Sequence, residues 1–375
     1  MPKRGLEPPK VAPHAPEACA STSFATSAMT KVYHSNALSE RGTIEVPMTD
    51  QNLISPLPVE FIRRLTQLYG NSTNQILDTF KAPKPTTFRV NTIKLSVNEV
   101  ILALNAQGFE TEPVAWYYEA FILKSKTLRE LTDTVQYTKG QIYIQNLSSM
   151  IPALVLAPKD TDKVLDICAA PGSKATQLAV YMKNRGRITA NDSSRIRIYR
   201  LQANRERQDA RSVRIVENDA RSIWQKYPEF FDCTLADVPC SMEARFSCDQ
   251  PDSYKDWSLK KIKDMMSLQK WILRSAISAT KAGGTIVYST CTLSPEENEQ
   301  VIDWVLKKEK GNVQVVPIDL QNAPLTQGLV NWGDKKYHKS IVQTKRVTPS
   351  PTMEGFYIGK LTKIHSSIPK ILTQE

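Results

Sequence analysis

Two cysteines in distant parts of the sequence each follow an apolar run that is typical of a β-strand. Cys240 comes shortly after the run 231–236, and Cys291 comes shortly after the run 284–288. Since open parallel sheets bind ligands at the carboxyl ends of their strands, we expect the two thiols to lie together in a two-thiol active site. Each cysteine alone could instead fill the core, because free cysteine is among the most buried residue types.

A turn of small residues joins the first predicted strand of the same region to its helix, over 168–174. Such a turn lets a ligand approach the backbone closely. Asp192 and Asp219 follow the next two predicted strands, where their carboxylates could accept ribose hydroxyls and an adenine amino group. The GxGxxG pattern of dinucleotide sites is absent, so we favour S-adenosylmethionine, which carries no phosphate. The alternative is an ordinary turn with both acids as helix caps.

A methyl donor in this turn would give the two thiols a shared task. Carbon 5 of cytosine is a poor nucleophile, but a thiolate that adds to carbon 6 turns the ring into an enamine that attacks through carbon 5. Afterwards the carbon 5 proton must leave and the thiolate must be expelled, which a second group assists. Asp237 could hold the base, and Lys174 could support the site or the nucleophile as a basic neighbour.

Three motifs contain these residues: LDICAAPGSK at 165–174, DVPCS at 237–241 and YSTCTLSPEENE at 288–299. Together they resemble the Sun/Fmu (RsmB/NOP-like) family of S-adenosylmethionine-dependent RNA cytosine-C5 methyltransferases. Shorter similarities at 89–92, 143–149 and 355–357 extend the resemblance over about residues 58–362.

The resemblance implies a role for each matching residue. Cys291 would be the nucleophile that attacks carbon 6, and Cys240 would serve product release. Asp237 would contact the target base and border the cofactor, and Lys174 would lie beside both. The implied cofactor-binding residues are Cys168, Ala169, Ala170, Pro171, Gly172, Ser173, Lys174, Asp192, Arg197, Asp219 and Asp237.

Two further points qualify this assignment. Arg197 could equally be a solvated residue of its helix. Ser173, Val238 and Met242 replace smaller residues of the family pattern, and we expect them to narrow the pocket or alter the loop that reaches the RNA.

Composition favours a polyanionic partner in a reducing compartment. The chain has 375 residues, with 49 basic and 38 acidic side chains and a net charge of +11, although a solvated basic surface is the alternative. Its six cysteines show no CxxC and no disulfide spacing, which predicts a cytoplasmic protein. The four histidines lie in the terminal regions, so neither a histidine triad nor a metal site is expected. No apolar stretch reaches the twenty residues of a membrane span.

The pattern along the chain predicts four regions. Residues 1–50 are rich in proline and are expected to be a disordered tail that need not be native, with Met29 or Met48 as alternative starts. Residues 51–145 predict a small α/β RNA-positioning domain, 146–364 a methyltransferase domain and 365–375 a short tail.

The fold class expected from this pattern is α/β, with a doubly wound class I methyltransferase (Rossmann-like) sheet beside the smaller domain. Catalytic-domain strands are predicted at 164–167, 187–190, 213–216, 233–236, 285–288 and 355–361, and helices at 174–182, 195–208, 259–280 and 296–307. In the smaller domain we expect a helix from Pro58, strands at 86–92, 121–123 and 142–144, and a helix opened by the capping box Ser96–Glu99.

Two basic stretches are candidates for RNA contact. Residues 185–214 hold nine arginines and three acids, and Ile196, Ile198 and Leu201 are expected to pack the intervening helix on the sheet. The stretch 332–346 places Trp332 and Tyr337 among Lys335, Lys336, His338, Lys339, Lys345 and Arg346, where the aromatic rings could stack on bases. The arginine-rich stretch could also be a solvated face.

The sequence therefore predicts a monomeric enzyme that methylates carbon 5 of a cytosine in rRNA or tRNA, in a single strand or loop. Two alternatives stay open at this point. One is a catalytically inactive RNA-binding protein or chaperone, and the other is a nicotinamide-dependent oxidoreductase on a similar sheet.

Overall fold

The structure is a computed structural model that describes residues 55–367. The predicted tail over 1–50 lies outside the described residues, and so does most of the predicted tail over 365–375. Within the described part of the chain, no helix combines the length and the apolar character that crossing a membrane would require.

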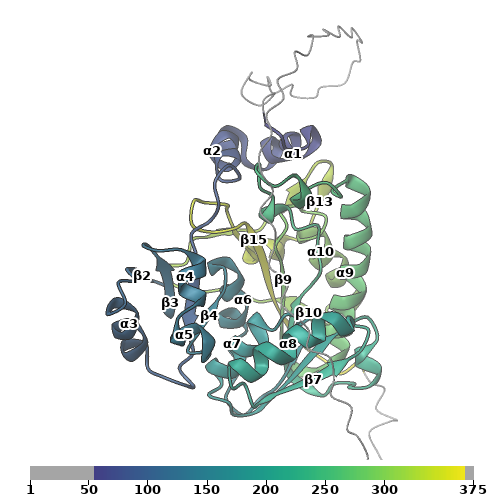
Figure 1. Ribbon diagram of the computed structural model, residues 1–375. Helices are drawn as coiled ribbons and strands as arrows, with labels where there is room; N and C mark the ends of the chain where they lie inside the picture. Colours follow the sequence, from purple (N-terminus) through teal and green to yellow (C-terminus); the bar gives the residue numbers. More distant parts are fainter. Residues whose placement is uncertain (1–54, 368–375) are drawn as a thin grey trace, which may run out of the picture. The chain divides into compact units, whose positions relative to one another are not determined.

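A large mixed sheet forms the centre of the catalytic region (Figure 1). Its strands are β5 (Lys163–Asp166), β6 (Arg187–Asp192), β7 (Val213–Glu217), β8 (Phe231–Asp237), β9 (Thr280–Thr290), β10 (Val313–Val315), β11 (Leu325–Gln327), β14 (Lys345–Val347) and β15 (Phe356–Lys363). The parallel strands lie in the order β7-β6-β5-β8-β9. β15 is antiparallel to β9, and β10 and β14 pair with different stretches of β15. The predicted doubly wound sheet is confirmed, with antiparallel strands added at one edge.

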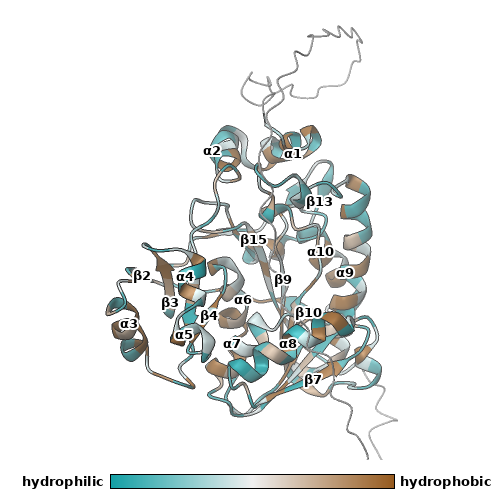
Figure 2. Cartoon of the chain, viewed as in Figure 1, coloured by the Kyte–Doolittle hydropathy of each residue, from teal (hydrophilic) through white to brown (hydrophobic). Residues whose placement is uncertain are grey.

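Helices cover both faces of this sheet because successive strand residues face opposite cores. Val164 lies in one hydrophobic cluster and Leu165 in the other. The first cluster includes residues of α6 and α7, and the second includes residues of α9 and α10. The helices of this region are α6 (Leu147–Leu156), α7 (Ser173–Tyr181), α8 (Arg195–Arg207), α9 (Leu259–Ala279) and α10 (Glu299–Glu309). Figure 2 shows hydrophilic and hydrophobic residues alternating along α9, as expected of a helix with one buried side.

A smaller antiparallel sheet precedes this region in the chain. Its strands β1 (Thr87–Val90), β2 (Thr111–Val114), β3 (Tyr117–Leu123) and β4 (Ile142–Ile144) lie in the order β2-β3-β1-β4. The helices among them are α3 (Val97–Asn105), α4 (Leu128–Thr132) and α5 (Val135–Thr138). The predicted capping box is confirmed, because Ser96 N donates to Glu99 Oε2 at 2.9 Å and Glu99 N donates to Ser96 Oγ.

The first two described helices, α1 (Val59–Tyr69) and α2 (Thr73–Asp78), do not join the core of the small sheet. Phe61 of α1 packs against Phe246 and Trp257 of the catalytic region, with ring centroids 4.9 and 5.8 Å apart. The helix from Pro58 was predicted, but its packing against the segment that contains Phe246 and Trp257 was not. The boundary at 145/146 between the two domains stays a prediction.

Arg89 of β1 ties the small sheet to the start of α7. Its side chain is fully buried, and it donates to Gln145 Oε1 at 3.0 Å, to Thr176 Oγ1 at 2.8 Å and to the carbonyl of Ser173 at 3.2 Å. Because Ser173 belongs to the predicted cofactor turn, the small sheet supports that turn directly.

Several elements were not predicted. The helix α6 is one of them, because its residues are buried on almost every side and give no polar face to read. The others include α2, β2, α4, α5, β10, β11, β14 and the two-stranded ribbon of β12 (Asn331–Trp332) and β13 (Lys335–Lys336). These elements are too short to produce a clear periodicity.

The close approach of α8 to the small sheet predicts a strong sensitivity at Gly140. Its φ is +66°, and a Cβ there would overlap the carbonyl oxygen of Arg207. Gly70 has a φ of +53°, but no described atom lies within 4 Å of its Cβ position. Both glycines have a positive φ, so alanine is strained at either position, but we expect Gly140→Ala to lower the free energy of unfolding by about 2 kcal/mol more than Gly70→Ala, since only the change at Gly140 adds steric overlap. Denaturant unfolding measures both, and equal losses would contradict this packing.

Candidate active site

A pocket of about 240 Å³ opens at the carboxyl ends of β5 and β8, where the strand order reverses. Doubly wound sheets bind their ligands at this point. The lining consists of Ser149, Asp166, Cys168, Ala169, Ala170, Pro171, Ser173, Lys174, Arg197, Asp237, Val238, Pro239, Cys240, Met242, Arg245 and Cys291. Most of the predicted site residues therefore meet in one pocket, and Gly172, Asp192 and Asp219 lie outside its lining.

The two predicted thiols are in direct contact. Cys240 Sγ and Cys291 Sγ are 3.4 Å apart. The parallel pairing of β8 with β9 sets Asp237 opposite Ser289, so the chain leaves both strands at the same level and each cysteine follows within a few residues. The expectation that both thiols emerge together at strand ends is confirmed.

The two thiols differ in acidity. The pKa of Cys291 is lowered, first by the hydrogen bond from Cys240 and then by the Arg245 guanidinium, although burial opposes the shift. The pKa of Cys240 is raised well above its usual value by the same hydrogen bond and by burial. Cys291 is therefore the more acidic thiol of the pair, and Cys240 is the thiol that keeps its proton to higher pH.

Asp237 is held in a fixed orientation beside the thiols. Its Oδ2 accepts from Lys174 Nζ at 2.6 Å, and its Oδ1 accepts from Ser289 Oγ at 2.8 Å. Lys174 is itself buried and also donates to Ser149 Oγ at 2.8 Å. Since both carboxylate oxygens already have a partner, this group keeps one orientation toward the pocket.

The predicted cofactor turn is shaped by Gly172 and Asp192. Gly172 has a φ of +107°, and a Cβ there would lie 2.8 Å from Leu201 of α8. Asp192 is buried and accepts from the backbone N–H groups of Ala170 at 3.3 Å and Ser194 at 2.9 Å. Arg197 donates to the Ala170 carbonyl and lies 3.4 Å from Asp192. These contacts fix the turn backbone at the edge of the pocket.

Asp219 is placed differently. It forms an ion pair with Arg221 at 2.6 Å, which lowers the pKa of its carboxyl, and it lies outside the pocket lining. Its predicted contact with an adenine stays a prediction.

Asp166 is a site residue to which sequence reasoning gave no role. It lies at the end of β5 within the pocket lining, and neither carboxylate oxygen has a hydrogen-bond partner within the described residues. Burial and then Asp237 raise its pKa to about 8. An orphaned buried carboxylate suits a ligand that brings a cationic donor, such as the ammonium group of S-adenosylmethionine. The sequence feature that could have identified Asp166 is its position at the end of the first predicted parallel strand.

Arg245 was also missed. It lies in the helical turn η4 (Glu243–Arg245) after the first cysteine motif, lines the pocket and is 3.4 Å from Glu354. Cys291 contributes most to the raised pKa of its guanidinium, so the two groups stabilise each other's charged forms. Sequence alone gives no sign of this contact, because the turn that brings Arg245 to Cys291 depends on packing with α1.

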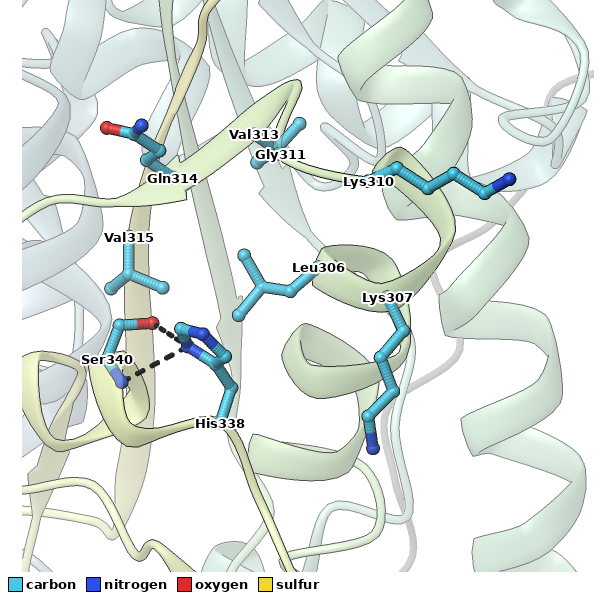
Figure 3. A pocket seen from close by; sticks show the side chains of 9 residues that line it. All are labelled: Leu306, Lys307, Lys310, Gly311, Val313, Gln314, Val315, His338 and Ser340. Carbon is cyan, nitrogen blue, oxygen red and sulfur yellow. Dashed lines mark hydrogen bonds between the residues drawn. The ribbon is translucent and has the colours of Figure 1, made fainter.

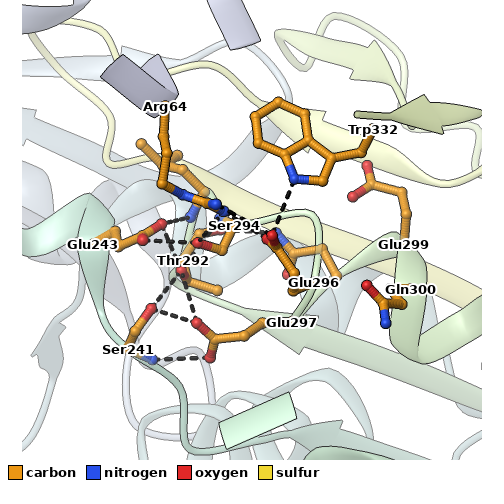
Figure 4. A network of polar contacts seen from close by, with 12 residues as sticks. Arg64, Ser241, Glu243, Thr292, Ser294, Glu296, Glu297, Glu299, Gln300 and Trp332 are labelled. Carbon is orange, nitrogen blue, oxygen red and sulfur yellow. Dashed lines mark hydrogen bonds and ion pairs between the residues drawn. The ribbon is translucent and has the colours of Figure 1, made fainter. Parts of the chain in front are cut away.

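Two buried carboxylates join the loops that carry the cysteines (Figure 4). Glu243 accepts from Thr292 Oγ1 at 2.9 Å, from Ser294 Oγ at 2.7 Å and from Leu293 N at 3.1 Å. Glu297 accepts from Ser241 N at 3.0 Å and also from Ser241 Oγ. Ser241 Oγ lies 2.8 Å from Thr292 Oγ1, so the residue after each cysteine belongs to one network.

The environment of Glu297 changes its acidity. Burial and the neighbouring Glu243 raise its pKa to about 7. Gln269 of α9 donates to Glu297 Oε2 at 2.8 Å and to the Pro239 carbonyl at 2.9 Å, which links the first cysteine loop to the helix. The same network reaches α1, since Arg64 donates to Ser294 Oγ at 3.2 Å.

The second basic stretch is only partly exposed: Lys335, Lys336 and Lys339 lie on the surface, and RNA contact through them stays a prediction. Tyr337 and Arg346 are buried, and Arg346 makes two hydrogen bonds with Glu299, at 2.7 and 2.6 Å. The Trp332 ring lies beneath Arg64 and donates to Glu296. These side chains therefore hold α10 and α1 in place, which corrects the stacking role expected of them.

His338 of this stretch lines a different pocket, of about 580 Å³ (Figure 3). Its ring contacts Ser340 Oγ at 2.7 Å, and Leu306, Val313 and Val315 form the apolar side. The catalytic pocket, not this one, contains the thiols.

The arginine-rich stretch is largely exposed. Leu201 is the one buried residue of α8, whereas Ile196 is 74% and Tyr199 is 63% exposed. The expectation that Ile196 packs on the sheet is wrong, because this turn of the helix faces away from it. Ile196 and Tyr199 lie among the exposed residues Arg195 and Arg200.

Comparison with known proteins identifies the family. Residues 153–362 match the family described as 16S rRNA methyltransferase RsmB/F, and residues 57–147 match the N-terminal domain of 16S rRNA methyltransferase RsmF. The chain belongs to the RsmB/F methyltransferase family. The predicted family and the prediction of an enzyme are confirmed.

Three relatives illustrate how far the RsmB/F resemblance extends. The tRNA (cytosine(49)-C(5))-methyltransferase of Pyrococcus abyssi is 36% identical over 286 residues, which are 76% of this chain and 89% of that protein. Ribosomal RNA small subunit methyltransferase F of Vibrio cholerae is 36% identical over 324 residues, and the match spans 84% of this chain and 65% of that protein. A methyltransferase homologue of Pyrococcus horikoshii has a solved structure with 31% identity and a TM-score of 0.74, covering 84% of this chain and 100% of that one.

The acidity difference between the thiols predicts their order of alkylation. We expect iodoacetamide to modify Cys291 before Cys240, because the thiolate is the reactive form. Modification of Cys291 should begin at a lower pH than modification of an ordinary thiol. Arg245→Gln should move the Cys291 profile to higher pH, since it removes a neighbouring positive charge. Peptide mass spectrometry measures the extent of alkylation at each cysteine between pH 6 and 10, about two units either side of the pKa of a free thiol.

The matched control is Arg63→Gln, because Arg63 is an exposed arginine of α1 paired with Glu60. This change should leave the profile as it is in the wild type. Faster alkylation of Cys240, or an unchanged profile in Arg245→Gln, would contradict the assignment.

Proposed function

We propose that this chain transfers a methyl group from S-adenosylmethionine to carbon 5 of a cytosine in RNA, through a covalent bond between Cys291 and carbon 6. The observation that carries the proposal is the pair of contacting thiols with opposite pKa shifts beside Asp237 and Lys174. Family membership and the activities named for the relatives support it, including cytosine-C5 methylation of tRNA.

Cys291 begins the reaction. Its thiolate adds to carbon 6 of the cytosine, and the electron pair of the 5,6 double bond moves to carbon 5, which becomes nucleophilic. Asp237 faces the same pocket and can accept a hydrogen bond from the exocyclic amine of the base. The hydrogen bonds from Lys174 and Ser289 keep its carboxylate in place, so little reorganisation is required when the base enters.

Cys240 acts when the product leaves. Solvent water accepts the carbon 5 proton, the electron pair of that C–H bond forms the 5,6 double bond again, and the bond between carbon 6 and Cys291 breaks with its electron pair on sulfur. The expelled group is a thiolate, and Cys240, whose sulfur lies 3.4 Å from that of Cys291, is in position to donate its S–H to it. Loss of this donor leaves an unstabilised leaving group and slows the release.

The residues of the pocket fit S-adenosylmethionine, which supplies a methyl group on a positively charged sulfur when it binds. Asp166 would accept hydrogen bonds from its ammonium group. The turn 168–174 would contact the cofactor through its backbone, with Asp192 near the ribose hydroxyls and Arg197 at the pocket edge. Ser173, Val238 and Met242, which replace smaller family residues, all line this pocket, and we expect them to narrow it.

RNA would approach from the exposed side of α8. Arg195 and Arg200 can pair with phosphates, and the exposed ring of Tyr199 can stack on a base. Arg197, on the same helix, lines the catalytic pocket, so this surface leads to the thiols. We propose that residues 51–145 position the RNA and that the target cytosine lies in a single strand or loop, because it must leave any stack to reach Cys291.

We further propose that the protein works as a monomer in the cytoplasm. The chemistry needs two reduced thiols at 3.4 Å, which a reducing compartment maintains.

A trapping experiment tests the roles of the two cysteines. With substrate RNA and S-adenosylmethionine, Cys240→Ala should accumulate a covalent protein–RNA adduct that withstands denaturing electrophoresis, because the expulsion step is slowed. Cys291→Ala should form no adduct, since the bond-forming thiol is absent. Cys233→Ala, a buried cysteine of β8 outside the pocket, is the control and should turn over without an adduct. An adduct that requires Cys240 would reverse the assignment.

A further inference from the structure

A second pocket, of about 410 Å³, lies between α9 and the connection that contains the helical turn η3 (Ile223–Gln225). Its lining consists of Arg221, Trp224, Pro228, Trp271, Arg274, Ser275, Ser278 and Ser367. Among the residues that the structure describes, none lines both this pocket and the catalytic pocket. The two are therefore separate sites.

Two tryptophans line this pocket while exposed to solvent. Trp224 is 40% exposed and Trp271 is 51% exposed, although tryptophan is highly buried on average. The Trp271 ring packs edge-on against Trp304, with centroids 5.8 Å apart, so it is fixed and not free to turn inward. Fixed, exposed ring faces are what a planar ligand needs for stacking.

Cations lie close to Trp271 and to its neighbour Trp304, which lies outside the pocket lining. The Arg274 guanidinium lies 5.8 Å from the centre of the Trp271 ring, and Lys270 and Lys308 lie 5.7 and 5.9 Å from that of Trp304. Arg221 also lines the pocket and is paired with Asp219, while Arg274 lies 3.6 Å from Glu309. The two arginines of the lining are each paired with one acid, so the excess positive charge comes from Lys270 and Lys308 beside Trp304, next to the pocket.

Ser275 provides an independent sign of a ligand. It lines the same pocket and is 1% exposed, yet its hydroxyl has no hydrogen-bond partner among residues 55–367. A buried hydroxyl without a partner is costly. A polar atom of a bound molecule would remove that cost.

We propose that this pocket binds a nucleotide of the RNA at a site separate from the catalytic pocket. A base would stack on the exposed indoles, a phosphate would pair with Arg274 or Arg221, and Ser275 would hydrogen-bond a polar group of the nucleotide. The volume lies within the range of pockets that hold ligands of this size. The inference rests on the proposed function only in taking RNA as the partner.

The first test uses an RNA without cytosine, so that binding does not depend on methyl transfer. The probe is fluorescein-labelled oligo(U) of about 12 nucleotides, within the usual site size for single strands. In anisotropy titrations, Trp271→Ala should weaken binding about 5-fold or more through lost stacking. Arg274→Gln should reduce the slope of log affinity against log salt by about 0.7, the value for one phosphate contact on a single strand.

Lys263→Gln is the matched control, because Lys263 is an exposed cation of the same helix outside the pocket. It should bind oligo(U) with the affinity and salt slope of the wild type. Thermal unfolding checks that each variant is folded, and Arg274→Gln alters an exposed side chain, so it tests the proposal even if Trp271→Ala unfolds.

The second test measures methyl transfer to an RNA substrate. Both pocket variants should raise KM and leave kcat unchanged, since the pocket holds RNA away from the thiols. Loss of oligo(U) binding in both variants supports the pocket even if no methyl transfer is found. If both variants bind oligo(U) with the affinity and salt slope of the wild type, the proposal is wrong. That result would overturn it even if a protein partner is later found to occupy the pocket.

Discussion

The parallel pairing of β8 with β9 is the constraint on which the active site depends. It sets Asp237 opposite Ser289, so the first cysteine loop and the second begin at the same level of the sheet. The network of Glu243 and Glu297 then joins the loops through the residues next to each cysteine. Strand pairing places the two loops side by side, and the carboxylates fix their conformation, so that the two sulfur atoms lie 3.4 Å apart.

This constraint gives two chemically identical side chains different roles. The contact between the two sulfurs lowers the pKa of Cys291 and raises that of Cys240, and the Arg245 guanidinium lowers the pKa of Cys291 further. The hydrogen bond and the positive charge together make Cys291 the more acidic thiol. The second thiol remains protonated and is available as a donor, so a single contact provides both an activated nucleophile and a stabilised leaving group.

Residues whose position follows from strand ends were predictable from the sequence. The thiols, Asp237 and the cofactor turn all belong to this group, because a strand-like run fixes where the chain leaves the sheet. Arg245, Asp166 and Glu243 were missed, since their roles depend on which groups surround them after packing. Tyr337, Arg346 and Ile196 show the opposite error. Local composition suggested RNA contact for Tyr337 and Arg346, but tertiary packing buries both side chains. It suggested burial for Ile196, which is exposed.

The central claim is that Cys291 alone forms the bond to the base, and a substrate with fluorine at carbon 5 of the target cytosine tests it most directly in the wild-type enzyme. After methylation no proton is left on carbon 5, so the thiolate cannot be expelled and the protein stays joined to the RNA. The account predicts that peptide mapping finds the nucleotide on Cys291 and that a bond which survives denaturation is found only when S-adenosylmethionine is present. A nucleotide attached to Cys240 would contradict it.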